Sequence, residues 1–89
     1  MQLDQKNIVA AIKAKVVEIA ASLGSDAGDI DADDIIPVTG LIDSAGLLDL
    51  IAWFEGAYTF RIPTEDFTID NLGSMNAMAD YLLKSKGLL

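Results

Sequence analysis

Apolar residues recur at helical spacing through the first quarter of the chain. They begin after Asp4, a good helix N-cap residue, and return every three or four positions. Gly24 follows the last of them, and glycine commonly ends a helix. The pattern predicts a first helix with one buried face. The apolar positions of that face are Ile8, Ile12, Val16, Ile19 and Leu23.

A second amphipathic run begins at Asp43 or Ser44 and continues to about Gly56. Asp and Ser both favour the N-cap position. At 100° per residue Trp53 falls away from the apolar stripe, as does Asp49. Leu48 and Ala52 share a separate edge with Ser44 and Glu55, so this helix presents more apolar surface than a core contact needs. The stripe that we expect to face the core comprises Leu47, Leu50, Ile51, Phe54, Ala57 and Tyr58.

The remaining pattern is also helical. Pro63 cannot continue a helix, so we expect no helix to pass through it after the second amphipathic run. Residues 68–72 suffice for a short helical turn, and Ser74 precedes a last helix from Met75 to Leu83. No strand-like alternation of useful length occurs. The sequence therefore predicts a single all-α domain over residues 1–89, a four-helix bundle with three longer helices, one short helix and a long loop after the first helix.

That loop, residues 24–42, is acidic but carries apolar side chains that we expect to anchor it on the bundle. Its stretch from Asp29 resembles the start of a calcium loop, yet Asp34 stands where the glycine belongs and Gly40 where the bidentate Glu belongs. We therefore expect a solvated acidic surface and no metal site. The expected anchors are Ile30, Ile35, Ile36, Val38, Leu41 and Ile42.

Charge narrows the classes of partner. The formal net charge is −8, and the nine acids between Val16 and Phe60 have no Lys or Arg among them. This field disfavours nucleic acid and favours partners with basic surfaces. No apolar run reaches membrane-spanning length and the first residues lack a signal-peptide core, so we expect a soluble, cytoplasmic monomer with no membrane insertion.

The sequence contains neither histidine nor cysteine. A nucleophilic serine needs a base, typically His or Lys. The lysines of this chain lie in the first helix and at the far C-terminus, so we do not expect an enzyme. Two other roles stay open for Ser44. It could cap the second helix, which would make the chain an acidic protein–protein interaction module. It could also receive a phosphate-linked group from another enzyme, because a helix N-terminus favours phosphate.

The ordered set of motifs resembles the acyl carrier and peptidyl carrier protein family. Asp43-Ser44 is followed by an apolar, acidic helix (residues 47–55), by Ile62-Pro63, and by Asp80-Tyr81-Leu82 near the end of the last helix. The likeness covers nearly the whole chain. Within it, the stretch "GLIDSAG" is most similar to D-alanyl carriers and other stand-alone aminoacyl carriers.

The resemblance implies that Ser44, next to Asp43, accepts 4′-phosphopantetheine from coenzyme A through a separate phosphopantetheinyl transferase. The thiol of that group would hold an acyl or aminoacyl cargo as a thioester. A loading ligase and a downstream acyltransferase with basic patches would be further partners. The residues that the resemblance assigns to partner recognition are Asp43, Leu48, Asp49, Ala52 and Glu55.

Two departures from fatty-acid carriers bear on the site. Gly46, which follows Ala45, costs the first turn about 1 kcal/mol relative to alanine, so we expect a mobile helix start. Aromatic residues crowd the second helix and its exit, and we expect them to fill the core. A filled core would leave little room for a long acyl chain and implies a short or amino-acid cargo. These aromatic residues are Trp53, Phe54, Tyr58 and Phe60.

Overall fold

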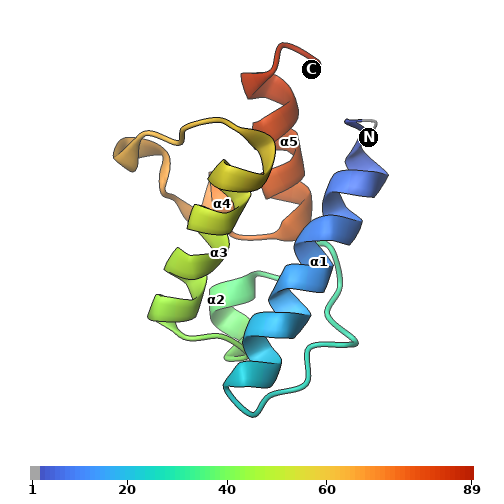
Figure 1. Ribbon diagram of the computed structural model, residues 1–89, viewed down its shortest axis with the longest axis vertical. Helices are drawn as coiled ribbons and strands as arrows, with labels where there is room; N and C mark the ends of the chain where they lie inside the picture. The colour runs from blue at the N-terminus through green and yellow to red at the C-terminus, as the bar shows by residue number, and fades with distance from the viewer. Residues whose placement is uncertain (1–2) are drawn as a thin grey trace.

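The computed structural model describes residues 3–89, and within this range every regular element is helical. This confirms the predicted all-α bundle. Three longer helices form its frame, and three one-turn elements lie in the connections between them (Figure 1). In chain order the elements are α1 (Gln5–Ser22), α2 (Ile36–Thr39), α3 (Ser44–Tyr58), η1 (Thr64–Asp66), α4 (Ile69–Leu72) and α5 (Met75–Ser85).

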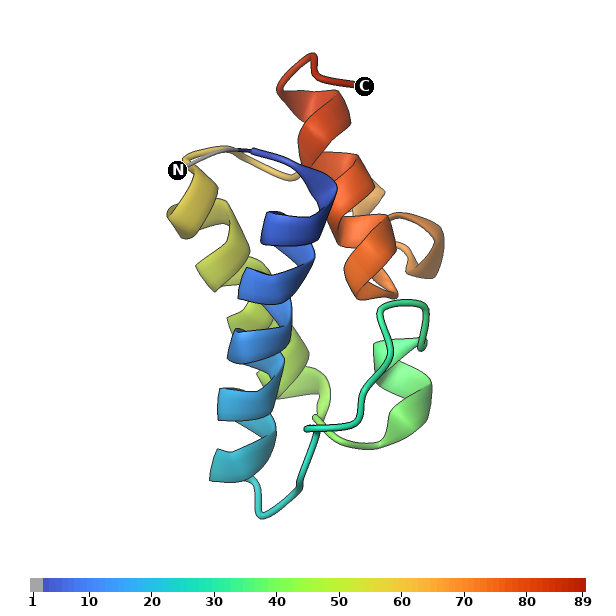
Figure 2. The same cartoon turned by 90° about the vertical axis from the view of Figure 1, so that its right-hand side faces the viewer.

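Helix α1 packs against both α3 and α5, while α4 packs against α5. Figure 2 shows the segment after α1 running from the end of that helix towards the start of α5 before it turns into α2. Asn76 holds the segment there, since its backbone N–H donates to the Ala32 carbonyl at 3.0 Å and its side-chain amide to Asp33 at 2.7 Å. The long loop is therefore fixed on the bundle.

Side-chain caps fix the starts of the helices. Asp4 accepts a hydrogen bond from the Asn7 N–H at 2.8 Å, and the Ser74 hydroxyl accepts one from the Ala77 N–H at 3.1 Å. Both caps confirm the predicted helix starts, because each satisfies an N–H that has no partner inside the helix. At the other end of α1 the backbone of Gly24 has φ +80°, a left-handed conformation that favours glycine.

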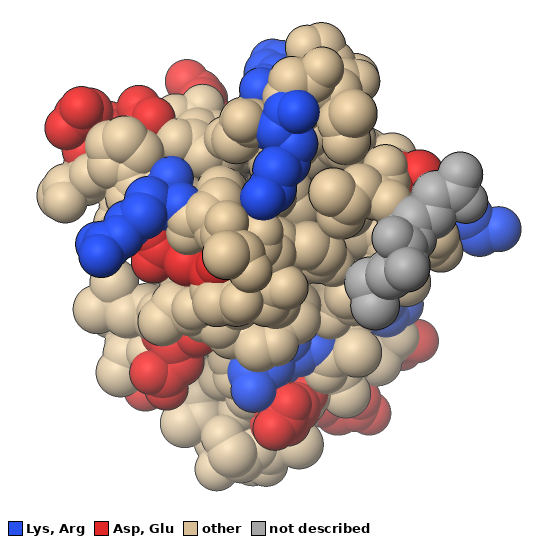
Figure 3. Space-filling model, turned by 45° about the horizontal axis from the view of Figure 1, so that its top comes forward, with Lys and Arg blue, Asp and Glu red and all other residues tan. Residues whose placement is uncertain are grey.

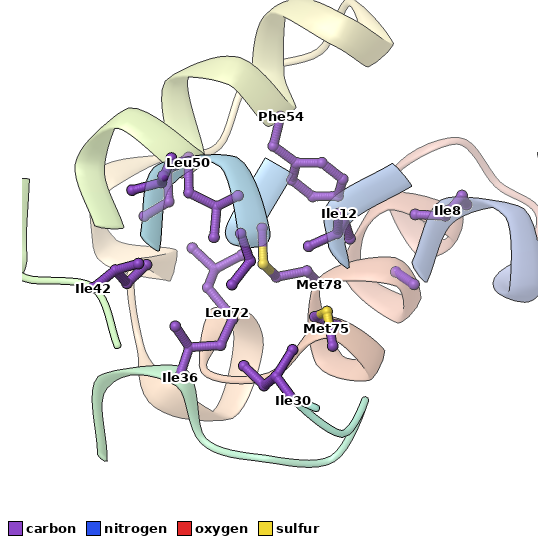
Figure 4. Close-up of a cluster of buried hydrophobic side chains, with 14 of the residues drawn as sticks. Ile8, Ile12, Ile30, Ile36, Ile42, Leu50, Phe54, Leu72, Met75 and Met78 are labelled. Atoms are coloured by element: carbon purple, nitrogen blue, oxygen red, sulfur yellow. The ribbon is translucent and has the colours of Figure 1, made fainter. Parts of the chain in front are cut away.

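The core gathers apolar side chains from all the longer helices and from the loop (Figure 4). Phe54 is fully buried, and its ring meets those of Tyr58 and Phe60 edge-to-face at centroid distances of 5.4 and 5.2 Å. These contacts confirm that the aromatic residues pack on the core. The largest fully buried side chains are Phe54, Ile8, Ile12, Ile36, Leu50, Met75, Met78, Leu82 and Val16.

The loop matches its prediction at several of the expected anchors and differs most at Val38, while Ile35 and Leu41 are half-buried. Ile30, Ile36 and Ile42 are buried as expected, but Val38 is 79% exposed. The reason is α2, which the sequence analysis did not predict. Pro37 favours the first turn of a helix. Two residues of helix rotate the side chain by about 200°, so burial of Ile36 turns Val38 outward.

Three positions in or next to the longer helices also differ from the pattern. Leu23 is 47% exposed because α1 ends at Ser22 and places it outside the helix. Ala57 is exposed, and the rings of Phe54 and Tyr58 provide the inward contacts at that end of α3. Trp53 is half-buried against the core cluster rather than turned away from it. The direction of a large side chain depends on its χ1 rotamer as well as on its angular position around the helix, so such a side chain can contact the core from the edge of the apolar stripe.

One side-chain hydrogen bond fastens the connection between α3 and α4. The Tyr81 hydroxyl of α5 donates to the carboxylate of Asp66 in η1 at 2.6 Å. Burial, then the hydrogen bond and charge of Asp66, raise the pKa of Tyr81 to about 12. The bond therefore persists across the neutral range and tethers residues 59–67 to the last helix.

Replacing Tyr81 with phenylalanine should expose this bond as a pH-dependent difference in stability. Near neutral pH we expect Tyr81→Phe to lower the free energy of unfolding by about 1 kcal/mol. An unfolded tyrosine loses its proton near pH 10 and the folded one near pH 12, so the wild type should lose this advantage between those values. Urea unfolding of both proteins across that interval measures the gap. A gap that stays constant would contradict the prediction.

Candidate functional site

The first turn of α3 holds the residues that the sequence singled out. Asp43 is its N-cap in extended conformation, and one carboxylate oxygen accepts the Gly46 N–H at 2.7 Å. The Asp43 carbonyl accepts the Leu47 N–H at 2.9 Å. Ser44 is the first helical residue. The structure thus assigns the cap to Asp43, one of the two residues at which the sequence allowed the helix to begin.

The Ser44 side chain is exposed, and its hydroxyl forms no hydrogen bond with any residue in the range 3–89. A capping serine would accept a hydrogen bond from an N–H two or three residues later, but Asp43 already occupies the Gly46 N–H. Capping therefore does not account for Ser44. Its hydroxyl is presented to solvent and available for chemistry performed by another protein.

The surroundings of Ser44 suit a phosphate-linked group. Within the described chain, the backbone N–H groups of Ser44 and Ala45 donate to no acceptor, as is usual at a helix start. These groups and the positive end of the helix dipole favour negative charge. Beside them lies an open pocket of about 250 Å³. It is lined by Pro37, Ile42, Asp43, Ser44 and Leu47.

A second pocket adjoins the first and shares Pro37 and Leu47 with it. Its volume is about 160 Å³, and its walls come from α2, α3 and the segment around α4. The wall residues are almost all apolar, and the side chains of Phe67 and Ile69 at its edge are exposed. Sequence analysis missed this surface, because the exposed residues belong to short segments without a helical period.

The expected partner-binding residues follow Ser44 along the outer side of α3. Leu48 is 58% exposed, and the side chains of Asp49 and Ala52 are exposed as well. Ser44, Leu48 and Ala52 are spaced by four residues, so they form one strip along the helix. An exposed leucine flanked by acids leaves an apolar contact with a charged border on this side of α3.

Glu55, at the far end of the strip, is half-buried and has a second role. One of its carboxylate oxygens accepts the Ile62 N–H at 2.8 Å. This bond ties the chain after α3 back onto the helix. The sequence pattern indicated the surface position of Glu55 but not this contact, because a bond across seven residues depends on how the chain turns at Thr59.

Basic side chains gather away from Ser44. Figure 1 shows that α3 begins in the half of the molecule away from the start of α1 and the end of α5. Figure 3 turns the upper end of Figure 1 toward the viewer, and Lys and Arg side chains are spread over that face among Asp and Glu side chains. The segment from Val16 to Phe60, which includes Ser44, contributes acids only. The site therefore lies in the acidic part of the chain.

None of the helices within residues 3–89 has the length and apolarity that crossing a membrane requires.

Comparison with known proteins gives a consistent set of relatives. The D-alanyl carrier protein of Streptococcus sanguinis is 31% identical over 70 residues, which cover 78% of this chain and 87% of that protein. The D-alanyl carrier proteins of Streptococcus gordonii and Streptococcus thermophilus are 30% identical with the same coverage. No family model and no solved structure matches the chain. On the identity and coverage of these relatives, the chain belongs to the family of D-alanyl carrier proteins, which are stand-alone carriers.

Proposed function

We propose that this protein is a non-catalytic carrier whose Ser44 is the attachment point of 4′-phosphopantetheine, with residues 1–89 forming one carrier domain. The observation that carries the proposal is the exposed Ser44 hydroxyl at the start of α3, beside a cap that Asp43 supplies. Membership of a carrier protein family supports the same role.

The composition of the chain fits a prosthetic group that brings its own reactive atom. When bound, 4′-phosphopantetheine supplies a thiol that can hold a cargo as a thioester, and this sequence has no cysteine to do so. The chain's part is to present the Ser44 hydroxyl, while Ser44 and Ala45 offer N–H donors to a phosphate. The sequence has no histidine to act as the base, so we expect the phosphopantetheinyl transferase to supply the group that removes the Ser44 proton.

We further propose an amino-acid cargo of the D-alanyl type, loaded by an aminoacyl ligase and passed to an acyltransferase in the cytoplasm. The names of the relatives support this choice of cargo. The interior is consistent with it, because the side chains of Phe54, Leu50 and Met78 at the centre of the bundle are fully buried. A small polar cargo would stay in solvent rather than enter the core.

Loading by a transferase tests the attachment site directly. Incubation with coenzyme A, magnesium and a broad-specificity phosphopantetheinyl transferase should add one 4′-phosphopantetheine group to the wild type and none to Ser44→Ala, as measured by intact mass. Ser85→Ala is the matched control, since it removes another exposed serine hydroxyl and should leave loading intact.

A wild-type protein that stays unmodified, under conditions that load a known carrier, would overturn the proposal. The chain would then be better described as an acidic helical module that binds partner proteins without a prosthetic group.

Recognition by partners should depend on the strip along α3. Replacing the exposed Leu48 with aspartate removes its apolar contact and should raise the KM of the transferase about tenfold with little change in kcat. Ala10→Asp adds the same charge at an exposed position of α1 and serves as the control. Equal effects of the two substitutions would show that only net charge matters.

Cargo size can be tested by NMR on loaded protein. Attaching an octanoyl group should leave the methyl resonances of Leu50 and Met78 where they are in the alanyl-loaded form, because both side chains are fully buried in a close-packed core. Large shifts of these buried methyl groups would show that the bundle opens to admit an acyl chain.

A further inference from the structure

Gly46 lies where α3 approaches α1 closely, near the proposed attachment site. It is buried on the inner side of the first turn of α3. A Cβ atom at this position would lie 3.0 Å from the Cγ2 methyl of Ile19 and 3.3 Å from the Asp43 carboxylate. It would also meet the Cβ of Ile42 at 3.4 Å. The absence of a side chain therefore lets the start of α3 approach the end of α1 closely.

The neighbours of this contact are the residues that hold Ser44 in place. Asp43 immediately precedes Ser44, and its carboxylate receives the Gly46 N–H at 2.7 Å. Ile19 is buried on the last turn of α1, and the methyl that faces Gly46 is attached to its Cβ, so it moves only with the backbone or with χ1. A side chain at position 46 must displace either Ile19 or the capping carboxylate.

The contact also changes the expectation for this turn. Glycine disfavours a helix interior, and on sequence alone it predicted a mobile start for α3. The structure places that glycine in close packing and gives its N–H a charged acceptor. Packing on α1 and the Asp43 cap act on the same turn, so together they restrict the region that carries Ser44.

We infer that Gly46 is a positioning residue, which sets where the first turn of α3 presents the Ser44 hydroxyl to a modifying enzyme. The inference rests on the proposed function, because it concerns the rate at which Ser44 is modified. Because Gly46 is buried, we expect it to act through the residues that it packs against and not by direct contact with coenzyme A. It acts by allowing Asp43 and Ile19 to hold the turn from two sides.

The test compares the kinetics of 4′-phosphopantetheine transfer to the wild type and to Gly46→Ala, below the melting temperature of both. The partner strip at Leu48 and Ala52 is unchanged, so KM should stay within about twofold of the wild type. Displacing the first turn of α3, and with it the Ser44 hydroxyl, by a few tenths of an ångström should lower kcat about threefold to tenfold. Hydrogen exchange at the amide of residue 46 should accelerate, because its bond to Asp43 weakens.

Rescue distinguishes positioning from general destabilisation. Ile19→Leu keeps the side-chain volume but removes the methyl on Cβ that a new side chain would strike, so Gly46→Ala with Ile19→Leu should regain most of the lost kcat. Leu82→Ala opens the core in α5 without touching this contact and should leave kcat unchanged while folded. If Gly46→Ala does not fold, Ile19→Ala removes the contact from the α1 side and should also lower kcat.

The outcomes separate the two proposals. A wild-type protein that receives no 4′-phosphopantetheine overturns the proposed function and this inference with it. A modified wild type, together with unchanged kcat in Gly46→Ala, overturns only the positioning role. A fall in kcat that Leu82→Ala reproduces, or that Ile19→Leu does not relieve, also overturns it, because stability alone would then explain the loss.

Discussion

The packing of α1 against both α3 and α5 is the contact on which the remaining structure depends. Ile12 and Val16 have no solvent-exposed surface, and their stripe is the surface against which the other two long helices close. Because apolar burial is the main favourable term in folding a chain of this size, this stripe fixes where α3 can lie. The functional end of α3 is thus located by a helix that carries none of the proposed site residues.

Much of this arrangement follows from local rules. A single segment of sequence is enough to predict features that depend on spacing within one helix. These features are the apolar periods of α1, α3 and α5, the caps at Asp4 and Ser74, and the outward strip of α3. Ser44 could be identified in the same way, because its importance lies in a motif rather than in a contact between distant segments.

What the sequence did not predict depends on neighbours far along the chain. The outward turn of Val38 requires the one-turn helix α2, whose Ile36 N–H donates to the carbonyl of Gly73 at 2.7 Å. The packing of Trp53 depends on the core cluster, to which other helices contribute most of the side chains. The close approach at Gly46 depends on Ile19 of another helix. No periodicity within a segment encodes such relations.

The bond between Glu55 and the Ile62 N–H has a consequence for how surface acids of this protein are interpreted. A carboxylate that looks like one more charge for a basic partner is also a structural acceptor. A glutamine at this position would keep an acceptor while losing the charge, whereas an alanine would lose both and release the turn after α3. Only the glutamine substitution therefore tests electrostatic attraction to a partner by itself. The alanine substitution would weaken both partner binding and the folded structure, so its effect could not be assigned to either.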